Sequence, residues 1–205
     1  MFLKFIVFLF VLLVSLSDFY ISANDDIDEI ASVYVVKSKL DRPIPEEEWD
    51  ESVKLWVARS CAGEAGFDAV DECIGIAWVY ATRWNGLKKS NIKFVDVVRK
   101  YSAAIKHKST HTRRWILNLN LGGKKPVGWP NRLRWKNHKD MWNEILFALD
   151  EWVDGKRPNP VLGADHFGGS MDKPGKYWVR ILPSNGMKFR NRFYRSPCAA
   201  PVFID

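Results

Sequence analysis

Apolar side chains recur at steps of three and four residues near the start of the folded region, the spacing of one face of an α-helix. Gly63 and Gly66 flank the last member of this series, so we expect the helix to end there in a tight turn. Pro45, followed by three glutamates, is typical of a helix start. The face comprises Trp49, Val53, Trp56, Val57, Ser60, Cys61 and Glu64.

Glu64 is the charged member that closes this apolar face. Partial burial removes water from a carboxylate and disfavours its ionised form. A carboxylic acid that keeps its proton near neutral pH is what a general acid requires. The residues alone therefore make Glu64 a candidate catalytic acid, and the alternative is a glutamate that points into solvent at a frayed helix end.

The same reading predicts the remaining elements. Helical spacing occurs over residues 68–84, 94–101 and 138–154, with Asn-Gly or Gly after the first and last of these ranges. Residues 106–136 are basic, aromatic and rich in turn residues, so we expect loops or a small sheet. Residues 161–205 are typical of short strands and loops. The predicted fold class is α+β, mostly helical, in a single domain.

An apolar run near the N-terminus indicates a targeting segment. One lysine precedes an apolar run over residues 5–16, and small residues follow up to Ala23. A membrane-spanning helix needs about twenty apolar residues, so we predict a secretory signal peptide over residues 1–23. Cleavage after Ser17 and an uncleaved anchor are the alternatives. The expected location is secreted or periplasmic, and N-terminal sequencing of the exported protein tests the predicted start after Ala23.

Composition fits one globular domain. The chain has 205 residues, of which 47% are hydrophobic and 27% charged. We expect a flexible entry segment over residues 24–45 and the folded domain over residues 46–205. Ten tryptophans are unusual for this length; we expect most of them in the core and some along a groove for sugar rings.

The three cysteines have a use in an oxidising compartment. Cys61 lies in the last turn of the first predicted helix and Cys73 early in the next. A Cys61–Cys73 disulfide would join these helices beside Glu64, while a pairing that uses Cys198 stays open. Neither the cysteines nor the four histidines have the spacing of metal ligands, and we expect no metal and no cofactor.

Several short motifs occur in an order that one protein family shares. Together they resemble the SleB-type cell-wall hydrolases, the spore-cortex-lytic family of peptidoglycan-cleaving enzymes, over roughly residues 53–195. The motifs are Ala58-Arg59-x-x-x-Gly63-Glu64-Ala65, Ile76-Ala-Trp-Val79 with Arg83, Val97-Val98 with Tyr101-Ser102, Asn159-Pro160-x-x-Gly163-Ala164-Asp165-His166-Phe167, Pro174 to Trp178, and Asn191-Arg-Phe-Tyr-Arg195.

The resemblance implies a lysozyme-like domain whose small β and loop part lines a groove for glycan strands. It implies that Glu64 is the catalytic acid of a peptidoglycan glycosidase. Two positions depart from the family: Lys100 stands where glutamine is usual, and Asp165 where threonine is usual. The substrate-binding positions that the resemblance implies are Tyr101, Ser102, His166, Phe167 and Trp178.

Asp165 decides between two mechanisms. Glycosidic bonds are usually cleaved by two carboxyl groups, so Asp165 as partner of Glu64 would give a muramidase-type hydrolase. With Glu64 alone, the product is a 1,6-anhydro sugar and the enzyme is a lytic transglycosylase. A loop aspartate that makes a turn hydrogen bond is the alternative role of Asp165. We favour the one-glutamate route.

The formal net charge of +7 changes the expected partners. Basic residues concentrate in residues 106–115, 124–125 and 132–136, which favours attraction to an anionic cell-wall surface over about 8–10 Å. Peptidoglycan glycan strands are the expected substrate, with no nucleic acid, no stable membrane insertion and a monomeric protein. The alternatives are a non-catalytic wall-binding module and a basic nucleic-acid binder, because single strands also bind basic and aromatic surfaces.

Overall fold

The computed structural model describes residues 42–87, 91–106, 114–168 and 176–197. The predicted signal peptide, nearly all of the entry segment and Cys198 lie outside the described residues. The chain divides into two units, residues 1–41 and 42–205. Only the second unit is considered below.

The first predicted helix is divided in two. Residues Glu46–Glu48 form the 3₁₀ helix η1, and α2 spans Glu51–Glu64. Asp50 separates them because its side chain accepts a hydrogen bond from Val53 N at 2.8 Å, the contact that starts an α-helix. The backbone of Trp49 is extended, so the prediction that Trp49 shares the helical face of Glu64 is wrong.

The other predicted helices are present with shifted ends. They are α3 over Val70–Leu87, α4 over Phe94–Tyr101 and α7 over Trp135–Val153. Helix α3 continues through the Asn-Gly pair that we expected to end it. Between α5 and α7, the described residues 114–134 contain the short helix α6 over Arg114–Leu117 and otherwise turns and loops. Helix α5 over Ala103–Lys106 was not predicted.

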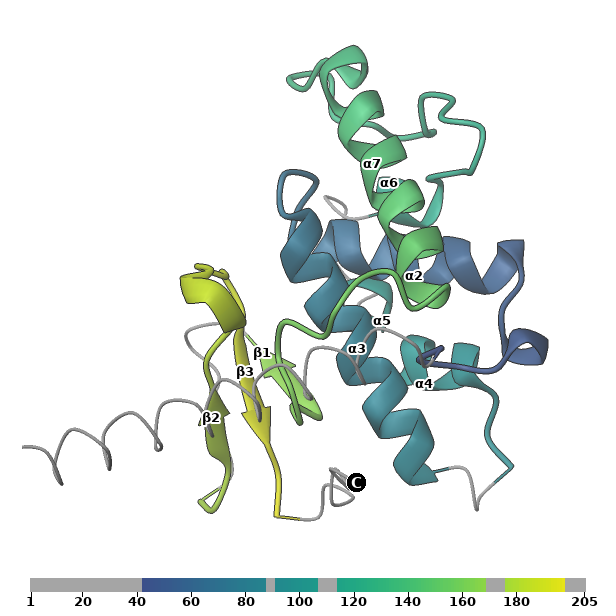
Figure 1. Ribbon diagram of the computed structural model, residues 1–205. Helices are drawn as coiled ribbons and strands as arrows, with labels where there is room; N and C mark the ends of the chain where they lie inside the picture. The colour runs from purple at the N-terminus through teal and green to yellow at the C-terminus, as the bar shows by residue number, and fades with distance from the viewer. Residues whose placement is uncertain (1–41, 88–90, 107–113, 169–175, 198–205) are drawn as a thin grey trace, which may run out of the picture. The chain divides into compact units, whose positions relative to one another are not determined.

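A small antiparallel sheet completes the unit. Strands β1 over His166–Gly168, β2 over Val179–Ile181 and β3 over Arg192–Arg195 are arranged in the order β1-β3-β2, with a 3₁₀ turn, η4, over Ser184–Gly186. His166 and Arg180 both lie opposite Tyr194, on its two sides. In Figure 1 the strands lie to one side of the helices. The predicted α+β, mostly helical class is confirmed.

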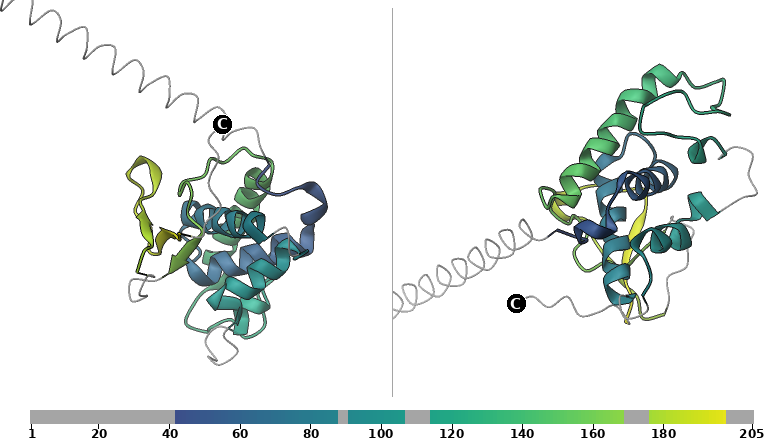
Figure 2. Two further views of the ribbon diagram at one scale, coloured as in Figure 1. Left: turned by 90° about the horizontal axis from the view of Figure 1, so that it is seen from below. Right: turned by 90° about the vertical axis from the view of Figure 1, so that its right-hand side faces the viewer.

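Helices α2, α3, α4 and α7 pack around a core rich in aromatic residues. Trp142 and Trp152 of α7 are fully buried in it. The segment between α6 and α7 runs beside the N-terminal half of α7 (Figure 2), where Trp142 Nε1 donates to Asn120 O at 2.9 Å. All ten tryptophans lie among the described residues; four are buried in the core, and five more are partly buried and pack against it.

The predicted disulfide is present. Cys61 of α2 is bonded to Cys73 of α3, with their Cα atoms 4.9 Å apart. The bond closes the loop that follows Glu64 and ties the two helices together at this point. Among the described residues, no helix is both long and apolar enough to span a membrane.

Candidate active site

Glu64 is the last residue of α2, and a tight turn follows it. Gly66 has a φ of +95°, a left-handed conformation that favours glycine. A Cβ at Gly66 would lie 2.7 Å from Arg190 Nη1, which donates to Ala65 O at 3.0 Å. The predicted turn is therefore confirmed, and an arginine that precedes β3 holds it.

The Glu64 carboxylate is held at one of its two oxygens. Oε1 accepts hydrogen bonds from Ser102 Oγ at 3.1 Å and from Ala104 N at 2.7 Å. Among the described residues, no protein group contacts Oε2 by a hydrogen bond or an ion pair. Gly63 makes this geometry possible, because a Cβ there would overlap with the Cβ of Ala104. Since Glu64 is half-buried, Oε2 is the oxygen left for another molecule.

Behind Glu64, buried hydroxyl groups form a continuous series. Ser60 Oγ donates to Ser102 Oγ at 2.9 Å and lies 2.6 Å from Tyr80 Oη. All three side chains are fully buried. Burial is the main cause that raises the pKa of Tyr80, so its phenol keeps its proton.

A second buried carboxylate supports the backbone around Glu64. Glu72 of α3 accepts from the backbone N of Arg190 at 2.7 Å, the backbone N of Asn191 at 2.8 Å and Asn191 Nδ2 at 2.7 Å. The same Asn191 amide donates to Glu64 O at 3.1 Å. Glu72 thus links α3, the start of β3 and the end of α2, which is a structural role.

The Asp165 side chain is buried, and both of its carboxylate oxygens accept hydrogen bonds. Oδ1 accepts from Ser196 N at 2.8 Å and Oδ2 from Ser196 Oγ at 2.6 Å. His166 Nδ1 lies 2.9 Å from Oδ1. Burial by itself raises the pKa of Asp165, but His166 and the two Ser196 donors outweigh it and lower the pKa to about 2. Asp165 therefore carries no proton at neutral pH.

Each of the predicted aromatic positions contacts a ring or a guanidinium group. Tyr101 faces Arg83, whose guanidinium carbon lies 3.9 Å from the ring centre. Phe167 packs edge-on against Tyr80, with ring centres 5.7 Å apart. His166 and Trp178 have ring centres 3.9 Å apart.

The contacts join Glu64 to Ser102 in one group and Asp165, His166 and Trp178 in another. Among the described residues, no hydrogen bond or ion pair joins Glu64 to Asp165. The hydroxyl series extends from Glu64 to Tyr80, and the ring of Phe167 packs against Tyr80.

The sequence reading missed Ser60, Tyr80 and Glu72 as parts of this site. Ser60 was assigned to the apolar face of the first helix without a role. Tyr80 and Glu72 carried no signal of their own, because their partners lie 20 to 119 residues away along the chain.

Two further features of the described residues lie apart from the predicted site. A cavity of about 370 Å³ lies elsewhere, beside Asp71, Glu151 and Arg157, and none of the seven predicted residues lines it. In this cavity, Arg157 already forms ion pairs with both Asp71 and Glu151. Within the described ranges, no cluster of histidine, cysteine and acidic residues has the arrangement of a metal site.

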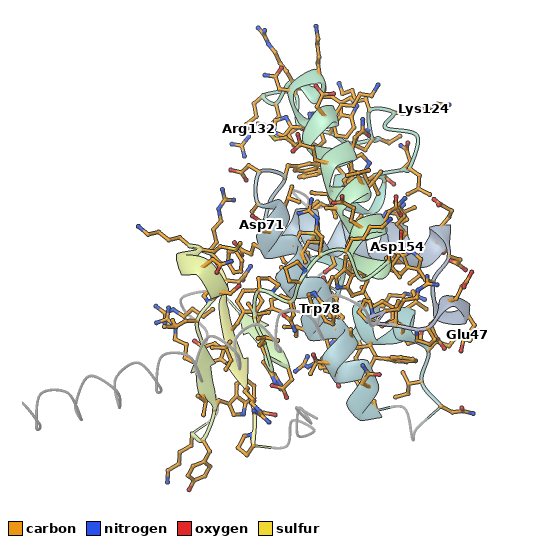
Figure 3. The ribbon with its side chains drawn as sticks, viewed as in Figure 1. Glu47, Asp71, Trp78, Lys124, Arg132 and Asp154 are labelled. Carbon is orange, nitrogen blue, oxygen red and sulfur yellow. A yellow bond between two sulfur atoms is a disulfide. The ribbon has the colours of Figure 1, made fainter. Side chains whose placement is uncertain are left out.

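The N-terminal end of α7 carries unpaired positive charge. No acidic residue occurs between positions 114 and 139, and Figure 3 shows Lys124 and Arg132 at the end of α7 opposite Asp154. Among the described residues, none of the exposed cations here forms an ion pair. We call them the basic end of α7: Lys124, Lys125, Arg132, Arg134, Lys136 and Lys139.

Comparisons with protein-family models, with curated proteins and with solved structures gave no match to this chain. The similarity to SleB-type hydrolases therefore rests on the ordered motifs alone.

Proposed function

We propose that this protein is an exported peptidoglycan glycosidase that cleaves the glycan backbone between N-acetylmuramic acid and N-acetylglucosamine. Glu64 is its single catalytic acid and base. The observation that carries the proposal is the asymmetric Glu64 carboxylate, with two donors on Oε1 and no protein partner on Oε2 among the described residues. A fixed carboxyl with one oxygen available to a substrate suits proton transfer to a glycosidic oxygen.

In this proposal the domain is lysozyme-like and the glycan lies in a groove beside Glu64. The half-buried rings of Tyr101, His166, Phe167 and Trp178 supply its walls, since each is partly exposed. Ser102 is fully buried, so we assign it to holding Glu64 and not to touching a sugar.

The state of Asp165 supports the one-glutamate route. Glu64 first protonates the glycosidic oxygen as the bond to C1 breaks. Its carboxylate then takes the proton of the muramic 6-hydroxyl, whose oxygen bonds to C1 and closes the 1,6-anhydro ring. Asp165 has a pKa of about 2 and both oxygens occupied by Ser196, so it is a poor base and a poor nucleophile.

The surroundings of the site fit an exported wall enzyme. The Cys61–Cys73 disulfide is a feature of oxidising compartments. The basic end of α7 suits an anionic cell-wall surface, because unpaired exposed cations attract polyanions without any specific pocket. The predicted signal peptide agrees with this location.

The deciding experiment is mass spectrometry of the products released from purified peptidoglycan. We expect anhydro ends from the wild-type protein and no products above background from Glu64→Gln, which keeps the size of the side chain but cannot deliver a proton. Reducing ends would indicate the two-carboxyl hydrolase. Binding without any cleavage by the wild-type protein would indicate a wall-binding module, and cleavage by Glu64→Gln at the normal rate would refute the proposal.

The role of the basic end of α7 is tested by a charge reversal. We expect Lys124→Glu/Lys125→Glu to weaken binding to anionic cell walls at low salt, with little effect at high salt. Lys93→Glu/Lys188→Glu is the matched control, because it makes the same change in net charge at exposed positions elsewhere. Equal losses in both variants would show that net charge alone matters.

A further inference from the structure

Three buried hydroxyl groups form a series that ends at one oxygen of Glu64. The steps are 2.6 Å from Tyr80 Oη to Ser60 Oγ, 2.9 Å from Ser60 Oγ to Ser102 Oγ, and 3.1 Å from Ser102 Oγ to Glu64 Oε1. The residues come from α3, from α2 and from the junction of α4 and α5. The series therefore depends on the packing of several elements.

The direction of every proton in the series follows from the carboxylate. An ionised carboxylate can only accept, so Ser102 must donate to Oε1. The oxygen of Ser102 then accepts the proton of Ser60. Because the proton of Ser60 is used, Tyr80 must donate to Ser60, and all three hydroxyl groups point toward Glu64.

The series orients Glu64 and does not carry a proton away. Its far end is the phenol of Tyr80, which is fully buried and is kept protonated because burial raises its pKa. The charged groups that act on this phenol are Glu64 at the end of α2 and Arg83 on α3, while the α4–α5 junction supplies neutral donors.

We propose that Ser60 and Tyr80 are positioning residues that fix Glu64 Oε1 as an acceptor and leave Oε2 as the oxygen that gives and takes the catalytic proton. This inference rests on the function proposed above. A proton on Oε1 would displace two donors, whereas a proton on Oε2 displaces none. When Oε2 is protonated, Oε1 is a carbonyl oxygen that accepts the same two bonds. Both proton transfers can then occur without a rearrangement of the site.

Tyr80→Phe and Ser60→Ala test the inference. Each removes a hydroxyl without touching the substrate, so we expect kcat to fall about 3- to 10-fold and KM to stay within about twofold. Because both changes interrupt the same series, the kcat of the double variant should be little lower than that of the less active single variant. Val79→Ala is the matched control, since it removes buried volume on α3 beside Tyr80 and should lower the melting temperature without lowering kcat.

A second measurement does not require catalysis. The Ala104 amide donates to Oε1, so its proton chemical shift in NMR spectra should respond to pH in the wild-type protein and lose this response in Glu64→Gln. We expect Tyr80→Phe to change the chemical shift of the Ala104 amide proton at a fixed pH, because its hydrogen bond to Oε1 is altered when the series is interrupted.

The two proposals fail in different ways. If Glu64→Gln cleaves normally, the proposed function is wrong, and the Ala104 resonance still tests the orientation of Glu64. If Glu64→Gln is inactive while Tyr80→Phe and Ser60→Ala leave both kcat and the Ala104 chemical shift unchanged, the positioning role is wrong and the proposed function stands. A rise in KM with unchanged kcat would also overturn the positioning role.

Discussion

Two carboxylates in this molecule receive the same kinds of donor in different arrangements. Glu64 and Asp165 each accept one serine hydroxyl and one backbone N–H. At Glu64 both donors bind Oε1. At Asp165 the donors are divided between Oδ1 and Oδ2. In the function proposed above, the distribution of donors over the two oxygens, more than their number, distinguishes Glu64 as the group that exchanges a proton from Asp165 as a group that anchors the chain.

The difference follows from where each residue sits. Glu64 ends a helix, and its two donors lie in one short segment, Ser102 to Ala104, which Gly63 allows to approach closely. Asp165 directly precedes β1, and both of its donors belong to Ser196, directly after the paired strand β3. A single residue that supplies both donors bridges the two oxygens and fastens the strand ends together.

The largest expected contrast is in turnover. Glu64→Gln should reduce turnover by about 10²- to 10⁴-fold, the usual contribution of general acid–base catalysis. Asp165→Asn should leave it within about tenfold, because the Asp165 carboxylate takes no part in the one-glutamate route. Initial rates of product release from purified peptidoglycan, compared at equal amounts of folded protein, measure both.

Equal losses of turnover in Glu64→Gln and Asp165→Asn would contradict the different roles assigned to the two carboxylates. They would make Asp165 a partner in a two-carboxyl hydrolase, and the products would then carry reducing ends. Circular dichroism and thermal unfolding of Asp165→Asn are the control, because a misfolded variant also loses turnover.

The second contrast is between two glycines that lie in helices, Gly63 in α2 and Gly86 in α3. An added methyl at Gly63 would overlap with Ala104 and move the amide that holds Glu64 Oε1. We expect Gly63→Ala to lower the free energy of unfolding by about 1–3 kcal/mol and to reduce turnover. Gly86→Ala is its control: no atom lies within 4 Å of the added Cβ, so it should be neutral or stabilise α3 by up to about 1 kcal/mol.

A Gly63→Ala protein with normal stability and turnover would show that the 102–104 segment can move without disturbing Glu64. In that case the two donors on Oε1 would be dispensable. Urea unfolding and the same initial rates measure both properties.

Local pattern was enough to predict the end of α2 with Glu64 in place. Helical spacing placed the carboxylate on the side of the core, and the flanking glycines indicated the turn. Position favoured the Cys61–Cys73 pairing, since residues on either side of a tight turn between packed helices come close together, but it left a pairing with Cys198 open until the structure showed the bond. These features depend on residues near one another in the sequence.

The features that the sequence did not reveal depend on contacts between distant residues. Ser60 and Tyr80 carried no signal, because a serine or tyrosine on a helical face is ordinary core until its partner is known. Glu72 had the pattern of an acid in a first helical turn, yet it is buried against Arg190 and Asn191. The helix break at Asp50 depends on nearby residues. It was still not predicted, because the apolar spacing typical of a helix continues through Trp49.

A smaller effect is expected in the pH dependence of stability, where wild-type protein is compared with Asp165→Asn. The folded-state pKa of Asp165 is about 2, below its ordinary value of 3.8. A carboxyl with a lowered pKa stabilises the folded state above the higher of these two values, and the stabilisation is lost as the pH falls from about 4 to about 2. Wild-type protein should therefore exceed Asp165→Asn in free energy of unfolding by up to about 2 kcal/mol at pH 7, with the difference shrinking below pH 4. A difference independent of pH in urea titrations would contradict this account of Asp165.

The smallest expected effect isolates the anchoring role of a single donor. Ser196→Ala removes the hydroxyl that donates to Asp165 Oδ2 at 2.6 Å and keeps the backbone donor on Oδ1. We expect it to cost about 1 kcal/mol of stability at pH 7. Because one of the groups that lower the pKa of Asp165 is lost, the acid-induced loss of stability should be smaller than in the wild-type protein and should be complete at a higher pH. Turnover should be unchanged, and Ser184→Ala, at an exposed serine, is the control. A fall in turnover for Ser196→Ala without a matching loss of stability would place Asp165 in the chemistry and reverse the roles assigned to the two carboxylates.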